Sequence, residues 1–177
     1  KYPEITEQII AEELMASKKL DANLAKKIAH QAEGNYNKAL HLLNKDNDDA
    51  LFEEWFVVWV RAAFKARGNA SAISDLIQWG ATIAKEGREV QKNFLHFCMQ
   101  YFRQALLLNY TANELVYLEP TFANFKLEKF APFVTGNNII EIFKELSDAM
   151  YHIERNGNAK IILTDLSIKL TRLIHKK

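Results

Sequence analysis

The sequence contains 177 residues, of which 49% are hydrophobic and 25% charged, with only 6 glycines and 3 prolines, so collagen-like, proline-rich and disordered chains are excluded. The net charge of +1 gives no broad electrostatic reason to expect binding to nucleic acid or to a membrane. A single cysteine, Cys98, excludes an internal disulfide and fits a reducing compartment, so we expect a cytoplasmic protein. No stretch reaches the ~18 apolar residues of a membrane span, and a first residue Lys1 suggests part of a longer chain.

Capping residues and a glycine divide the first 48 residues into three short helices. Thr6 can cap a helix that runs to about Ser17, and Asp21 can cap a second helix that ends at Gly34. Asn35 can then cap a third helix. So few residues bury only a small core by themselves.

A polar stretch at residues 44–49 is the best candidate for a domain boundary. We therefore predict one domain over residues 1–48 and a second over 49–177. Asp48 or Asp49 is predicted to cap the first helix of the second domain, which continues to about Arg67 and ends at Gly68.

Longer helices follow along the rest of the chain. Their predicted ranges are 71–85, 88–109, 138–156 and 159–175, with one or two short helices in the proline-punctuated region 111–136. Apolar residues surround the middle of the helix at 88–109, so this helix is central in its domain or is covered on one side by a partner. Almost no stretch shows the alternation of apolar and polar residues that is typical of a β-strand. The sequence predicts an all-α fold, with three small helices followed by a helical bundle.

The motifs of the common catalytic and metal-binding sites are missing. The sequence has no phosphate-binding loop, no nucleophile elbow, and no zinc or di-iron spacing among its five histidines. Cys98 lies between apolar residues and is interpreted as a small buried side chain rather than a reactive thiol. We expect no catalytic residue, no cofactor and no metal, and hence no enzyme activity in this chain.

One segment resembles the helical lid of AAA+ ATPases. It runs from Ala29 to Leu40 and reads AHQAEGNYNKAL. In that superfamily a helix ends in Ala-x-Gly and the next begins with Gly-x-x-Arg-x-Ala-Leu. Gly34, Ala39 and Leu40 match this pattern, but Asn37 stands where the family has the second sensor arginine. A neutral amide cannot supply that charge, which implies a member that does not hydrolyse ATP.

Further segments look like the C-terminal region of the clamp-loader subunits of bacterial DNA polymerase III. They are residues 87–103 and 153–158, with residues 163–170 consistent with them, and the likeness is greatest to the delta-prime family of these subunits. The resemblance implies an AAA+ lid over residues 1–48 and a collar domain over 49–177. It also implies a non-catalytic role in DNA replication as part of a five-subunit ring. The partners would be other clamp-loader subunits, while the sliding clamp and primer–template DNA would be reached only through the whole complex.

Two groups of side chains are candidates for the subunit interface. They are the tryptophan pair Trp55 and Trp59, and a polar stripe of Arg88, Lys92, His96 and Arg103. For the tryptophans the competing interpretation is core packing. For the stripe the competing interpretations are a solvated basic edge and, less favoured, contact with DNA phosphate.

Other functions stay open at this stage. Within the same family, the chain could be the corresponding region of an ATP-hydrolysing gamma/tau-like subunit or of a clamp-binding delta-like subunit, although Asn37 disfavours the former. Outside it, the chain could be a helical regulator that binds DNA or a small ligand. The near-neutral charge and the lack of a basic recognition helix disfavour that class.

Overall fold

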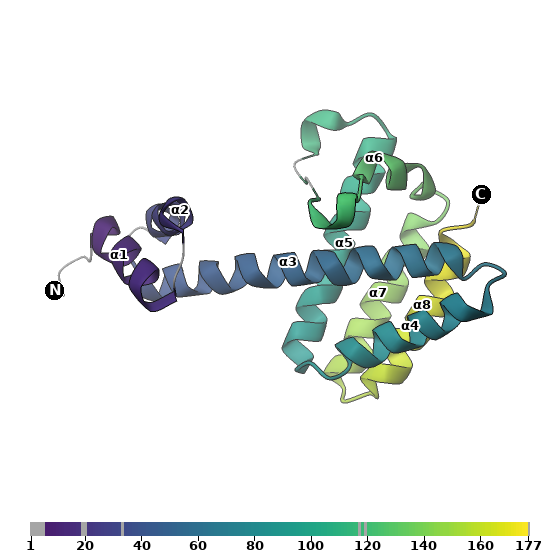
Figure 1. Ribbon diagram of the computed structural model, residues 1–177. Coiled ribbons are helices and arrows are strands. Elements are labelled where there is room, and N and C mark those ends of the chain that lie inside the picture. The colour runs from purple at the N-terminus through teal and green to yellow at the C-terminus, as the bar shows by residue number, and fades with distance from the viewer. Residues whose placement is uncertain (1–5, 19–20, 33, 117, 119, 177) are drawn as a thin grey trace. The chain divides into compact units, whose positions relative to one another are not determined.

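The computed structural model describes residues 6–176 except 19–20, 33, 117 and 119; the side chains of residues 18, 23, 24, 27, 31, 37, 38 and 40–47 also lie outside the described part. Throughout this part the chain is all-α, as predicted, and no strand occurs (Figure 1). The helices are α1 (Glu7–Lys18), α2 (Ala22–Ala32), α3 (Tyr36–Lys65), α4 (Ala70–Ile83), α5 (Arg88–Asn109), α6 (Leu127–Phe130), α7 (Ile139–Glu154) and α8 (Ala159–Leu173).

Four helix ends follow from local chemistry. Gly34, with φ of +79°, separates α2 from α3, and Gly68, with φ of +84°, follows the end of α3. Asn69 caps α4 by accepting a hydrogen bond from the Ser71 amide at 3.0 Å. Asn158 caps α8 in the same way through the Ile161 amide.

The predicted helix start at Asp48 or Asp49 is wrong. α3 runs without a break from Tyr36 to Lys65, straight through the polar stretch at 44–49. No glycine or proline interrupts these residues, and Asn, Asp or Lys inside a helix costs at most about 0.7 kcal/mol relative to alanine. Polarity alone therefore did not end the helix. The chain divides into two compact units, Lys1–Leu51 and Phe52–Lys177.

The first unit has a small aliphatic core. α1 packs against α2, and the fully buried side chains are mostly alanine with Ile10, Leu14 and Ile28 as the large members. Small residues at the contact let two short helices approach closely.

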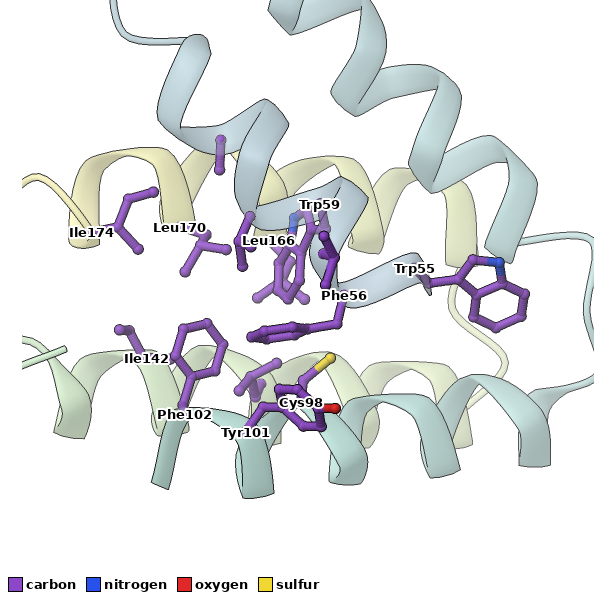
Figure 2. Close-up of a cluster of buried hydrophobic side chains, with 14 of the residues drawn as sticks. Trp55, Phe56, Trp59, Cys98, Tyr101, Phe102, Ile142, Leu166, Leu170 and Ile174 are labelled. Carbon is purple, nitrogen blue, oxygen red and sulfur yellow. The ribbon is translucent and has the colours of Figure 1, made fainter. Parts of the chain in front are cut away.

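The second unit is built on aromatic contacts between α3 and α5. Phe56 of α3 lies against Tyr101 and Phe102 of α5, with ring centroids 4.8 and 5.4 Å apart (Figure 2). On its other sides α5 contacts α6 and α7. Its apolar circumference is therefore explained by a central position within its own unit.

Hydrogen-bonded tryptophans join α3 to α4 and α8. The Trp59 indole donates to Ser167 Oγ at 2.9 Å and stacks on Trp79, with ring centroids 4.8 Å apart and planes inclined by 8°. Trp79 in turn donates to the Trp55 carbonyl at 2.9 Å. Gly80 lets α4 and α8 approach, because a Cβ there would lie 3.2 Å from Thr164 Oγ1.

The connection between α5 and α7 contains α6 and three short 3-10 turns, η1 (Asn113–Leu115), η2 (Phe122–Asn124) and η3 (Ala131–Phe133). The carboxylate of Glu53 on α3 holds this connection by accepting from the amides of Thr121 and Phe122, at 2.6 and 2.5 Å. It also accepts from the Tyr101 hydroxyl at 2.9 Å. One α3 side chain thus ties the connection to α3 at the start of η2.

Candidate interaction surfaces

The turn between α2 and α3 carries the residues of the lid-like motif. Gly34 adopts a left-handed conformation, which residues with a Cβ rarely take. Ala39, one turn into α3, is fully buried in the core of the first unit. The backbone of Asn37 and Leu40 belongs to α3, but their side chains lie outside the described part of the structure.

The two candidate interface tryptophans belong to the core. Trp59 is fully buried and Trp55 is 8% exposed. Their neighbours are Trp79, Phe52, Phe94 and Ser167, all within the second unit. Core packing, the competing interpretation, is therefore what this unit shows, and Trp59 presents no surface to a partner.

Two residues of the polar stripe on α5 make contacts within the second unit, and the other two are exposed to solvent. Lys92 is half-buried, and its ammonium lies 3.3 Å from a Glu89 oxygen and 3.4 Å from a Glu154 oxygen. Hydrogen bonds to these two carboxylates raise the pKa of Lys92. Arg88 hydrogen-bonds Asn156, at the end of α7. These two side chains fasten α5 to α7, while His96 and Arg103 are exposed.

A strip of exposed isoleucines borders the contact between α4 and α8. Ile73 and Ile77 lie seven and three residues before Gly80 on α4, and Ile161 and Ile168 lie three before and four after Thr164 on α8. These spacings put each isoleucine on the helical face that carries the contact residue. Between 42% and 66% of each of these four side chains is exposed. We call Ile73, Ile77, Ile161 and Ile168 the isoleucine strip.

A groove also runs between α3 and α4. It has a volume of about 490 Å³, with Trp55 and Trp79 among its lining residues. Both charge signs line it, with Glu54 and Asp75 as the acids and Arg61 and Lys65 as the bases. The mixture of signs gives the groove no selectivity for one kind of ion.

Among the residues that the structure describes, no group of three or more His, Cys, Asp or Glu side chains could hold a metal ion. Cys98 is fully buried beneath α3 (Figure 2), and this burial raises the pKa of its thiol well above the usual range. Over the same part of the chain, no helix combines the length and apolar character needed to cross a membrane.

Comparisons with protein-family models, with curated proteins and with solved structures gave no match.

Proposed function

We propose that this chain is a non-catalytic assembly module of a DNA-replication clamp loader, of the delta-prime kind. The observation that carries the proposal is the turn at Gly34. Its left-handed conformation between two helices, followed by the buried Ala39, fits the lid motif that the sequence resembles. A small helical unit followed by a larger helical unit fits the lid-and-collar order of that family.

In this proposal the second unit joins the subunit to its neighbours in the collar. An assembly surface needs apolar side chains that the unit's own fold leaves exposed. The isoleucine strip meets that requirement, since its four side chains are exposed beside the α4–α8 contact. His96 and Arg103 on α5 are exposed polar side chains that could make a further contact with a neighbouring subunit.

Assembly is tested by coexpressing the chain with the ATPase and clamp-opening subunits of a clamp loader from the same organism. Size-exclusion chromatography with light scattering then measures the mass of the complex. We expect a hetero-oligomer that contains this chain. A chain that stays monomeric with every combination of subunits contradicts the proposal.

The assembly surface is tested with the double variant Ile77→Glu and Ile168→Glu. Both side chains are more than 40% exposed, so the variant should fold while losing the complex. The matched control is Ile140→Glu, because Ile140 is an isoleucine of α7 that is 76% exposed and lies outside the strip. An intact complex with the double variant would move the interface away from the strip without removing the assembly role.

The absence of ATP chemistry is a separate part of the proposal. Asn37 replaces the sensor arginine of the family, and the sequence has no phosphate-binding loop. Isothermal titration with Mg·ATP should therefore give no binding heat for the chain alone. Micromolar affinity would contradict this part.

A further inference from the structure

A hollow lies between the C-terminal half of α3 and the segment that contains η2, α6 and η3. Its volume is about 460 Å³, within the range of about 300–1,000 Å³ that ligand pockets occupy. Phe125 and Phe130 contribute buried rings, Phe64 is half-buried, and Phe133 is 42% exposed. All the lining residues belong to the second unit.

Three cations line the same hollow. Arg61, Lys126 and Lys129 are all exposed, and the described residues that line the hollow include no acid. Here the hollow differs from the groove between α3 and α4, where acids and bases are mixed. Its charge favours an anionic occupant, and its phenylalanine rings favour an apolar or aromatic group.

Two contacts within the second unit hold the wall of the hollow in place. The Arg61 guanidinium donates to the Ala123 carbonyl at 2.9 Å, beside a turn in which Ala123 and Asn124 have φ of +49° and +55°. Elsewhere in the lining, the Phe64 ring packs edge-on against Phe133, with centroids 4.5 Å apart. A preformed wall lowers the entropic cost of binding.

We propose that this hollow binds an acidic peptide segment, which inserts one large apolar or aromatic side chain into the hollow, against the phenylalanine rings that line it, while its carboxylates face Arg61, Lys126 and Lys129. The carboxylates stay near the exposed rim, where they keep water, and the inserted side chain supplies the apolar burial. Binding of this kind does not require membership of a clamp loader, so it stands or falls separately from the proposed function.

The geometry favours a peptide over single-stranded nucleic acid. Stacking of successive bases needs exposed ring faces along a basic track. Here the rings meet one another edge-to-face, Phe64 with both Phe130 and Phe133, and three cations surround one hollow rather than following a track. The net charge of +1 gives no wider positive field.

The test is fluorescence anisotropy with the full chain and a fluorescein-labelled peptide that has one phenylalanine flanked by three glutamates on each side. A second peptide replaces the phenylalanine with alanine, a third replaces the glutamates with lysines, and a labelled oligothymidine probes nucleic acid. The chain is compared with the double variant Lys126→Glu and Lys129→Glu. The control variant is Lys85→Glu with Lys160→Glu, which makes the same change of net charge at exposed lysines that do not line the hollow.

We expect the acidic phenylalanine peptide to bind more tightly than the other two peptides, and the Lys126/Lys129 variant to lose about tenfold or more in affinity while the control variant keeps it. Equal loss in both variants would show a net-charge effect and overturn the proposal. Oligothymidine binding that depends on Lys126 and Lys129, without peptide binding, would also overturn it and make nucleic acid the occupant. Circular dichroism verifies that both variants keep the helical fold.

Discussion

Removing the Ser167 hydroxyl should destabilise the second unit, because the buried indole N–H of Trp59 then has no hydrogen-bond acceptor. Trp59 and Ser167 are both fully buried, and the indole N–H donates to Ser167 Oγ at 2.9 Å. In Ser167→Ala the indole N–H loses its partner in a place that water does not reach. An unsatisfied buried donor costs about 1–3 kcal/mol. With a urea m-value of about 2 kcal/mol/M, the unfolding midpoint should fall by about 0.5–1.5 M.

The three tryptophans of the chain provide the assay. Trp55, Trp59 and Trp79 all lie in the unit Phe52–Lys177, so tryptophan fluorescence during a urea titration follows that unit. The matched control is Thr171→Ala. The Thr171 hydroxyl also donates to the carbonyl four residues earlier, at 3.0 Å, as the Ser167 hydroxyl does at 2.7 Å. The control therefore removes the same type of helix hydrogen bond without orphaning an indole.

A double-mutant cycle separates this hydrogen bond from the rest of the packing. Trp59→Phe removes the donor and part of the ring stack on Trp79. In that background, Ser167→Ala should cost less than about 1 kcal/mol, because no donor is left unpaired. The reasoning is refuted if Ser167→Ala costs the same with and without the Trp59 indole, or if it costs no more than Thr171→Ala.

Three further predictions concern other parts of the second unit. Gly157→Ala should destabilise the second unit by about 1–3 kcal/mol, because the new Cβ would lie 2.8 Å from the His152 carbonyl oxygen, a backbone atom that cannot rotate away as a side chain can. Urea titration measures the change in the free energy of unfolding, and an unchanged value would contradict the prediction. Glu53→Gln should lower the free energy of unfolding by about 1–3 kcal/mol, because it weakens the acceptor for the Thr121 and Phe122 amides and the Tyr101 hydroxyl. Hydrogen exchange at those two amides should accelerate, and unchanged protection would refute the role of the carboxylate. Burial raises the pKa of the Cys98 thiol above its ordinary value of 9.0, so the folded state keeps a proton that the unfolded state releases. Stability from this group is therefore complete below the unfolded-state value and is lost as pH rises from there through the raised folded-state pKa, by at most about 1.4 kcal/mol per pH unit. Cys98→Ala should flatten the stability profile in that window, and an unchanged slope would contradict the assignment.

The sequence predicted helix ends well where a residue changes what the backbone can do. Gly34 and Gly68 adopt left-handed conformations at the predicted positions, and Gly87 precedes α5 as expected. The predicted break at 44–49 rested on polarity instead. Polar side chains are compatible with a helix, which explains why α3 continues through them.

The surfaces were harder to predict than the helices. In the helix predicted at 71–85, Leu76, Trp79 and Ile83 are buried, whereas Ile73 and Ile77, which are just as apolar, are exposed. A single helix pattern cannot tell how wide the covered face is, because the neighbouring helices decide that width. The basic hollow was invisible in the sequence for a similar reason, since Arg61 is more than sixty residues from Lys126 and Lys129 and only the tertiary fold brings them together.

The parallel stack of Trp59 and Trp79 has a spectroscopic consequence. Two indoles with centroids 4.8 Å apart and planes within 8° hold their electronic transitions in one fixed mutual orientation. Such a pair should contribute to the near-ultraviolet circular dichroism of the folded protein. A collapsed chain that keeps its helices but lets these rings rotate loses that contribution while it retains the helical far-ultraviolet bands. A single spectrum of a purified sample can therefore distinguish native packing from a merely helical state.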